Sequence, residues 1–175
     1  DSLKYLFEKN GFKIFKIEKN SVNGGSYRIY CKKKLKKSVI IKEKTSLIEI
    51  KKFIKRIELN KKKCLDFLNY AKNQNKKVFI YGASTKGNTL MQYYGINNKL
   101  IKYAAERSPE KWGKYTIGSG IEIISEKKAR ELNPDYFFAL PYGFINEFMK
   151  REKKWIKKGG VFLLPYPIFK KVDIK

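Results

Sequence analysis

The sequence predicts an α/β fold with a parallel sheet, because short apolar runs alternate with helical segments from residue 76 onward. The apolar runs expected to be strands lie at 78–81, 100–105, 121–124, 136–140 and 161–165. The segments expected to be helices lie between them, at 88–94, 125–132 and 145–157. Strands without polar alternation are typical of sheets that helices cover on both faces. We therefore predict a parallel sheet with flanking helices.

The first 75 residues predict a short helix, a hairpin and a long helix. Residues 2–10 place apolar side chains on one helical face, and Gly11 follows as a C-terminal stop. The segments 12–18 and 26–33 alternate between apolar and polar residues around a turn, so an antiparallel hairpin is expected. From 45 to 73 apolar residues recur at helical spacing, which predicts one long helix with its apolar stripe in the core. Such a helix would exceed roughly 40 Å, enough to bridge two domains or to form a dimer with a second subunit.

Composition limits the class of protein. The chain has 175 residues, which suits one ordinary domain or one domain plus a piece of another, and it begins without Met, as a fragment would. No apolar run approaches the roughly 20 residues that cross a bilayer, and no charged-then-apolar leader opens the chain, so we expect a soluble, cytoplasmic protein without membrane contact. Two isolated cysteines and no histidine exclude histidine catalysis within the chain and predict no metal or haem site.

A net charge of +25 raises the question of nucleic-acid binding, because lysines neutralise phosphates. Only five of the 41 basic residues are arginine, the residue that best reads guanine edges and phosphates. The lysines are also spread through every segment, as on solvated faces. We therefore do not expect specific nucleic-acid binding, although a lysine-rich nucleic-acid binder remains an alternative.

The turn that follows the first expected strand of the sheet is a candidate anion site. The chain stops being apolar at Tyr81 and passes through a polar, glycine-containing turn into a helix, so backbone N–H groups and a partial positive charge meet there. The expected ligand contacts are Gly82, Ala83, Ser84, Thr85, Lys86, Gly87 and Asn88. The spacing is not that of a Walker A loop, and the three-glycine dinucleotide fingerprint is absent. An anionic ligand is predicted without a choice between ATP and NAD, and an ordinary strand-to-helix connection is the alternative.

Four loops should meet at one edge of the sheet. Ligands of parallel α/β sheets bind beyond the carboxyl ends of the strands. The loops that follow those ends in this chain are 82–88, 106–114, 141–144 and 165–167. We expect the ligand at this edge.

Five stretches of the chain, in order and at compatible spacing, resemble one family. They read NGGSYRIY at 23–30, YGASTKGNTLMQYYGI at 81–96, AAERSPEKWGKYTIGSGIEI at 104–123, NPDYFFALPYGFINE at 133–147 and GGVFLLPYP at 159–167. Together they are similar to the C-terminal domain of nucleotide-sugar C-methyltransferases. Members of this family typically read HGGS-aromatic-R, YGA-x-x-KGNTLLN, D-R-x-P-x-K-x-G, PDY-apolar-LP-W-N-F and GG-x-F-apolar-P-x-P. The resemblance covers nearly the whole chain.

The resemblance implies a place for this chain within a larger enzyme of deoxysugar biosynthesis. In the family, a class I domain that binds S-adenosylmethionine precedes a Rossmann-like α/β domain, which helps to hold a nucleoside-diphosphate sugar. A base removes a proton next to a sugar carbonyl, and the resulting enolate carbon attacks the sulfonium methyl. By this resemblance, residues 1–40 would be the closing helix and hairpin of the methyltransferase domain, 44–75 a connecting helix and 76–175 the Rossmann-like domain.

The resemblance also implies which residues contact the nucleotide sugar. Besides the turn 82–88, the expected substrate-binding residues are Gly24, Gly25, Ser26, Arg28, Glu106, Arg107, Lys111, Pro141 and Tyr142. The catalytic residues are unknown, because the Tyr/Glu/His motif of the family would lie upstream. The methyl-donor pocket is missing too, so S-adenosylmethionine is expected only in the full-length protein, bound by an upstream domain, and the chain alone is expected to be inactive. The alternative from another class is a non-catalytic nucleotide- or phosphate-binding module.

Four departures from the family pattern affect the expected site. Asn23 stands in place of the usual His, Glu106 in place of Asp, Ile117 in place of Pro, and Tyr142 with Gly143 in place of Trp and Asn. The missing His removes an acid or base near the sugar. The Glu106 carboxylate would suit a ribose or sugar hydroxyl, and equally an ion pair with a nearby lysine. The sequence identifies neither the sugar nor the carbon that receives the methyl group.

Overall fold

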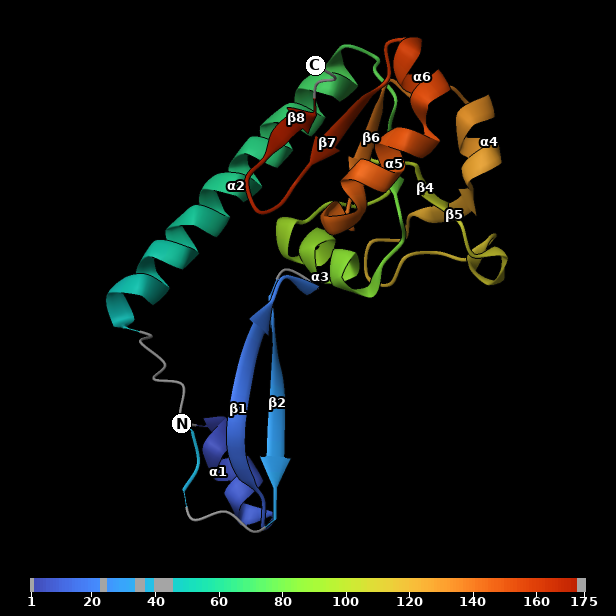
Figure 1. Cartoon of the computed structure of the whole chain (residues 1–175). Coiled ribbons are helices and arrows are strands. Elements are labelled where there is room, and N and C mark those ends of the chain that lie inside the picture. Colours follow the sequence, from blue (N-terminus) through green and yellow to red (C-terminus); the bar gives the residue numbers. More distant parts are fainter. Residues whose placement is uncertain (1, 23–24, 34–36, 40–45, 173–175) are drawn as a thin grey trace. The chain divides into compact units, whose positions relative to one another are not determined.

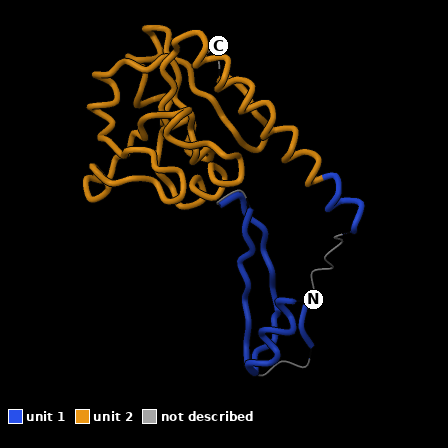
Figure 2. Tube along the Cα trace, turned by 180° about the vertical axis from the view of Figure 1, so that it is seen from behind, with its two compact units in different colours: residues 1–52 blue, residues 53–175 orange. Residues whose placement is uncertain are grey.

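The computed structural model describes residues 2–22, 25–33, 37–39 and 46–172. The chain forms two compact units, Asp1–Lys52 and Phe53–Lys175, which Figure 2 colours separately. The first unit holds a short helix and a hairpin, and the second holds an α/β fold with a six-stranded sheet. Among the described helices, none is long and apolar enough to cross a membrane.

The first unit is built on an antiparallel hairpin of β1 (Lys13–Asn20) and β2 (Ser26–Lys32). Before it, α1 (Ser2–Lys9) is followed by Gly11 in the left-handed region, with φ 76°, where the sequence predicts the stop. Ile14 on β1 is 1% exposed and is the buried apolar residue of this unit's described part. The predicted hairpin is confirmed, with strand ends that differ slightly from those expected.

The long helix α2 (Leu47–Asn73) is confirmed, but the prediction that its whole apolar stripe is core is wrong. Cys64 and Leu68 in the second half of the stripe are buried, whereas Leu47 and Ile54 are 76% and 51% exposed. The first half of the stripe is exposed because the helix is longer than the strands. A helix of 27 residues spans roughly 40 Å, and a four-residue strand only about 13 Å. The sheet therefore covers only part of the helix. Dimer formation through α2 stays a prediction.

The second unit is organised around a six-stranded sheet with the strand order β5-β4-β3-β6-β7-β8 (Figure 1). The first five strands are parallel, and β8 runs antiparallel to β7. The parallel sheet predicted from the sequence is confirmed. The sequence prediction lacks β8, because its segment is short and polar and becomes a strand only by pairing with β7. The strands are β3 (Val78–Tyr81), β4 (Tyr103–Glu106), β5 (Glu122–Ser125), β6 (Tyr136–Ala139), β7 (Val161–Leu164) and β8 (Lys170–Val172).

Helices cover both faces of this sheet, as Figure 1 shows. One face packs against α2 and α3 (Thr85–Tyr94), and the other against α4 (Glu126–Glu131), α5 (Ile145–Arg151) and α6 (Lys153–Lys157). Alternate residues of a strand point to opposite faces, so on β3 Ile80 joins the α2–α3 layer and Tyr81 the α4–α6 layer. The central strands are therefore buried on both sides.

A buried ionic network lies in the α4–α6 layer. Glu152, whose side chain is 1% exposed, separates α5 from α6 where the sequence predicts one helix over 145–157. Its Oε1 accepts hydrogen bonds from the Tyr81 hydroxyl and from Arg130 Nη1, both at 2.7 Å. Arg151 Nε donates to the Tyr81 hydroxyl at 3.1 Å. Burial, together with the Glu152 carboxylate, raises the pKa of Tyr81, so this hydroxyl is a structural group rather than an acid.

Glu152→Ala should lower the free energy of unfolding by roughly 2 to 3 kcal/mol, because the Tyr81 hydroxyl and the Arg130 guanidinium lose a buried acceptor. Glu147→Ala is the matched control. The Glu147 side chain is 54% exposed and pairs with Arg151 at the surface, so its removal should cost less than about 1 kcal/mol. Urea denaturation measures both values. Equal destabilisation would contradict a special role for the buried network.

Candidate functional site

The turn between β3 and α3 lies at the carboxyl edge of the sheet. α3 begins at Thr85, earlier than the start at residue 88 that the sequence predicts. Its N-cap is Ser84, whose Oγ accepts a hydrogen bond from Gly87 N at 3.1 Å. A capping serine satisfies an N–H group of the first turn, and this starts the helix within the polar segment. Lys86 therefore belongs to the first turn of α3 rather than to a loop, and it is exposed.

Two backbone donors at the start of α3 have no protein acceptor in the described part of the chain. The preceding Ala83 N donates to Glu106 Oε2 at 2.9 Å. By contrast, Thr85 N and Lys86 N make no hydrogen bond with any described residue. N–H groups in this position, together with the helix dipole, attract an anion. The start of α3 is therefore able to bind a phosphate or a carboxylate.

Gly82 and Gly87 pack the turn against the segment that follows β6. A Cβ on Gly82, whose φ is +85°, would lie 2.6 Å from Pro141 Cγ. A Cβ on Gly87 would lie 2.5 Å from Leu140 Cδ1. Any other residue at these positions would collide with that segment, so the two glycines allow Pro141 to contact the turn before α3.

Glu106 ties the turn after β3 to the loop after β4. Its Oε1 accepts hydrogen bonds from Arg107 N at 2.8 Å and Ser108 N at 3.1 Å. Its Oε2 accepts from Ala83 N at 2.9 Å and from Lys111 Nζ at 3.3 Å, and Lys111 also donates to Ala83 O at 3.1 Å. Of the two roles that the sequence leaves open, the ion pair with a lysine is present. A ligand hydroxyl would have to share oxygens that already accept protein hydrogen bonds.

Two tyrosines stand side by side after β6 and β7. Tyr142 opens the short 3-10 helix η3 (Tyr142–Phe144), and Tyr166 follows β7. Their ring centroids are 5.2 Å apart, with an angle of 68° between the ring planes. Tyr166 is 39% exposed and Tyr142 is half-buried. The pair therefore forms a partly open aromatic surface at the carboxyl edge.

Arg107 and Asn88, two other predicted ligand contacts at this edge, differ in exposure and in their protein partners. The Arg107 side chain is 75% exposed, and its Nη1 lies 3.8 Å from Glu147 Oε1. Asn88 is half-buried, and its Oδ1 is buried without a hydrogen-bond partner among the residues that the structure describes. Buried acceptors normally receive a donor. Asn88 Oδ1 is an exception to this rule among the residues that the structure describes.

The hairpin residues predicted to contact substrate belong to the other unit. They are Gly25, Ser26 and Arg28, and the Arg28 side chain is 66% exposed. Gly24 and the departure at Asn23 lie outside the described residues. The contribution of these residues to a substrate site stays a prediction.

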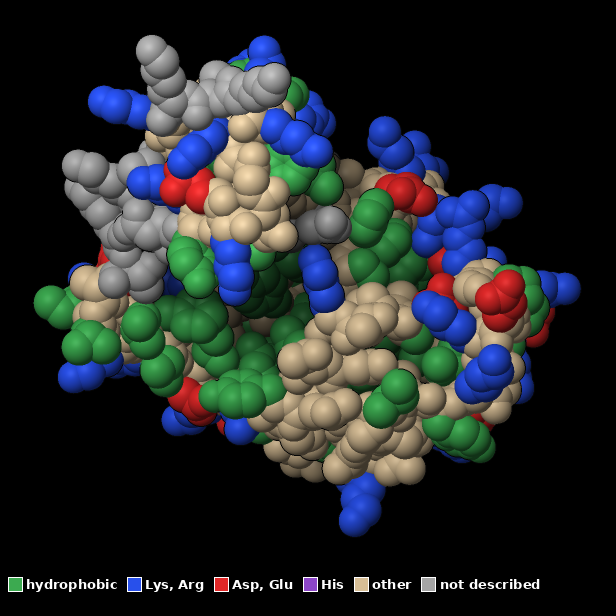
Figure 3. Space-filling view, turned by 90° about the horizontal axis from the view of Figure 1, so that it is seen from below, with side chains coloured by type: hydrophobic (Ala, Val, Ile, Leu, Met, Phe, Trp, Pro, Cys, Tyr) green, Lys and Arg blue, Asp and Glu red, His purple; other side chains and the backbone are tan. Residues whose placement is uncertain are grey.

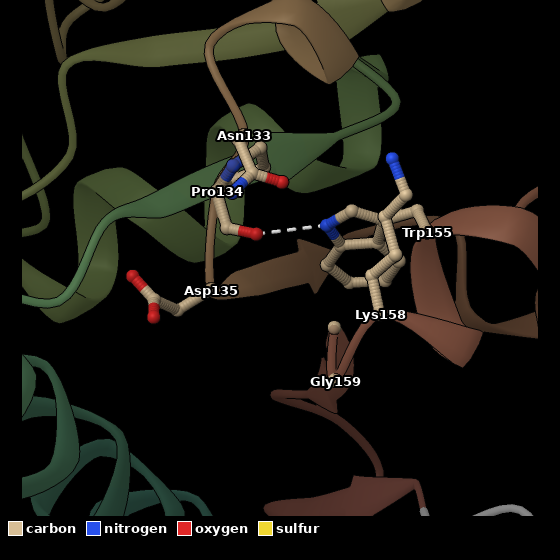
Figure 4. A pocket seen from close by; sticks show the side chains of 7 residues that line it. Asn133, Pro134, Asp135, Trp155, Lys158 and Gly159 are labelled. Atoms are coloured by element: carbon tan, nitrogen blue, oxygen red, sulfur yellow. Dashed lines mark hydrogen bonds between the residues drawn. The ribbon is translucent and has the colours of Figure 1, made fainter.

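A small pocket where β6 and β7 begin has a structural explanation (Figure 4). Trp155 Nε1 donates to Pro134 O at 2.8 Å, and a Cβ on Gly160 would lie 2.2 Å from the Trp155 ring. Asp135 accepts hydrogen bonds from Lys77 N at 2.8 Å and from Lys76 Nζ at 3.0 Å. These groups close a corner of the fold, so the candidate site is the carboxyl edge instead. The pocket is lined by Asn133, Pro134, Asp135, Trp155, Lys158, Gly159 and Gly160.

Comparison with known proteins places the sequence in a family. Residues 21–167, a stretch that includes all four loops of the carboxyl edge, match the family of the C-methyltransferase C-terminal domain. The chain belongs to this family. A curated relative, the C-methyltransferase NovU of Streptomyces niveus, is 26% identical over 178 residues, which cover 95% of this chain and 42% of the relative. The chain thus spans less than half the length of the curated relative that it matches.

Glu106 also bears on where a methyl donor could bind. In dinucleotide sites of parallel sheets, an acidic residue near the end of the second strand binds ribose hydroxyls. In the second unit the second strand along the chain is β4, which ends at Glu106. Because backbone N–H groups and Lys111 already occupy its carboxylate, a ribose at this edge, of S-adenosylmethionine or of any other nucleotide, would have to compete with these donors. No methyl-donor site is assigned to the described residues.

Tyr166 lies in the loop 165–167 that the sequence predicts at this edge, but it is not among the predicted ligand contacts. A signal was present, because an aromatic residue directly follows the apolar run of β7 at the edge where Tyr142 stands. The contact between the two rings depends on β6 and β7 being neighbours in the sheet. The sequence does not predict this strand order, and so it does not predict the contact between the two rings.

Gly82→Ala should destabilise the protein more than Gly113→Ala. Both glycines have positive φ, +85° and +75°, so both variants carry a similar backbone strain. Only at Gly82 would the added Cβ also collide with Pro141, which should cost roughly 1 to 3 kcal/mol more. Thermal unfolding compares the two variants. Equal melting temperatures would mean that the turn does not need its close approach to Pro141.

Proposed function

We propose that this chain is the nucleotide-sugar-binding part of an S-adenosylmethionine-dependent sugar C-methyltransferase of deoxysugar biosynthesis. The observation that carries the proposal is the start of α3, where Thr85 N, Lys86 N and the exposed Lys86 ammonium stand at the carboxyl edge. These donors suit a diphosphate, the charged part of a nucleoside-diphosphate sugar. Membership of a C-methyltransferase family supports the reaction class.

The charges around the turn support an anionic ligand. Glu106 is the acidic group that contacts the turn, and the Lys111 ammonium lies 3.3 Å from its Oε2. Arg107 follows Glu106 directly and pairs with Glu147 at 3.8 Å, so the exposed Lys86 ammonium is the cation that these two ion pairs leave in excess. A diphosphate at the start of α3 would therefore meet net positive charge in spite of the neighbouring carboxylate.

The chain would supply one part of the complete enzyme. Residues 1–40 would be the closing helix and hairpin of the methyltransferase domain, 44–75 the connecting helix and 76–175 the substrate domain. The match covers 42% of the curated relative, and S-adenosylmethionine would be bound by an upstream domain. The chain alone would bind the sugar nucleotide without transferring a methyl group, and the catalytic base would come from elsewhere in the full-length protein.

A nucleic-acid ligand has one observation in its favour, the net charge of +25. Figure 3 shows Lys and Arg side chains scattered over one face, with acidic and apolar side chains between them. A nucleic-acid site usually has its basic residues gathered into one patch or stripe. The sugar nucleotide is therefore the preferred ligand. A non-catalytic phosphate-binding module would use the same turn but would have no preference for a sugar.

The chain should bind uridine or thymidine diphosphate, or their sugars, more tightly than S-adenosylmethionine. The start of α3 offers donors to a diphosphate, a group that S-adenosylmethionine lacks. Isothermal titration calorimetry measures each affinity. Saturable binding of S-adenosylmethionine with no response to nucleoside diphosphates would refute the proposal. Tighter binding of an oligonucleotide at physiological salt would favour the nucleic-acid alternative.

Lys86→Ala should weaken diphosphate binding about 10- to 150-fold, because it removes a charge-assisted contact of roughly 1.5 to 3 kcal/mol. Folding should be nearly unaffected, since the residue is exposed. Lys72→Ala is the matched control, because it removes an exposed lysine from the last turn of α2 and lowers the net charge equally. Calorimetry and melting temperatures of both variants decide the matter. Equal diphosphate affinities of the two variants would mean that Lys86 is a solvated surface lysine that does not contact the ligand.

A further inference from the structure

The aromatic pair of Tyr142 and Tyr166 is a surface that a diphosphate alone would not use. We propose that this pair binds the nucleobase of the sugar nucleotide by stacking. The inference rests on the proposed function and names the part of the ligand that these residues contact. Aromatic side chains bind bases in this way because every base has a π face, and stacking tolerates differences between bases.

The contact of Pro141 with the turn brings the segment that carries Tyr142 to the same edge as the diphosphate site. Pro141 precedes Tyr142 and contacts the turn before α3, where a Cβ on Gly82 would lie 2.6 Å from Pro141 Cγ. Tyr166 follows β7, the neighbour of β6, and its ring centroid lies 5.2 Å from that of Tyr142. The tyrosine rings and the donors of α3 therefore belong to one packed edge, as the base and the phosphates of one ligand require.

The segment that carries Tyr166 is held in place by α2. Asn60, which is 3% exposed, donates from Nδ2 to Pro167 O at 2.6 Å and accepts at Oδ1 from Phe169 N at 3.2 Å. These two hydrogen bonds fix the chain immediately after Tyr166. A ring that is presented in one position loses less conformational entropy when a base stacks on it.

The polar groups of the pair are also consistent with a ligand. Among the described residues, neither the Tyr142 nor the Tyr166 hydroxyl has a hydrogen-bond partner. Tyr81 at the end of β3 differs, because its hydroxyl bonds to Glu152 and to Arg151 and its ring is 1% exposed. A buried tyrosine hydroxyl usually has such partners, whereas the hydroxyl of a partly exposed tyrosine is free to bond to water or to a ligand. The pair offers ring surface and two hydroxyls, which match the π face and the polar edge of a base.

Calorimetry of the whole chain with uridine diphosphate and with pyrophosphate tests the assignment. Tyr166→Ala should weaken uridine diphosphate binding about 5- to 150-fold, the range expected for one lost base stack, and leave pyrophosphate binding unchanged. Tyr142→Leu should act in the same way while it keeps an apolar contact with the α4–α6 layer. Tyr166→Phe keeps the ring and should retain most of the affinity.

Two further variants separate this inference from the proposed function. Lys86→Ala should weaken both ligands. Tyr70→Ala removes a tyrosine of α2 that is 58% exposed and should weaken neither. Unchanged uridine diphosphate affinity in Tyr166→Ala and Tyr142→Leu, or an equal loss for both ligands, would overturn the nucleobase assignment while diphosphate binding stood. No binding of uridine diphosphate to the unaltered chain would refute the proposed function, and this inference with it.

Discussion

The carboxylate of Glu106 is the constraint on which the carboxyl edge depends. It accepts donors from two different connections, Ala83 N in the turn after β3 and the N–H groups of Arg107 and Ser108 after β4. Lys111 closes the arrangement, because its ammonium contacts both the carboxylate and Ala83 O. The turn is thereby fixed from outside the helix that it starts, and the N–H groups of α3 have a defined position before any ligand arrives.

The edge combines parts with different mobility. The backbone donors of α3 are fixed by the Ser84 cap and by the packing of Gly82 and Gly87. The Lys86 side chain is exposed and adaptable. Tyr166 lies between these extremes, because its backbone is held by α2 while its ring is partly open. The edge therefore combines fixed backbone donors with an adaptable cation.

Local chemistry made part of this fold predictable. The uniformly apolar runs of β3, β6 and β7 already indicate a buried parallel sheet, and the polar turn after Tyr81 indicates its binding edge. The predictions that were wrong or incomplete concern features that depend on contacts between residues distant in sequence. One helix over 145–157 becomes two, with Glu152 between them bonded to Tyr81 and Arg130, far away in sequence. The stripe of α2 looks uniform in sequence, and only the short strands decide how much of it is covered. The contact between Tyr142 and Tyr166 likewise depends on the strand order.

The shortness of the strands has a consequence for how this protein can evolve. Each of the five parallel strands has four residues, so each gives only two side chains to either layer. A substitution in β3 or β6 therefore removes half of what a strand contributes to one face. By contrast, no lysine or arginine is buried in the part of the chain that the structure describes. Apart from Arg130 and Arg151, which bond to the buried groups of Glu152 and Tyr81, the surface charges can therefore change in evolution while the sheet stays the same.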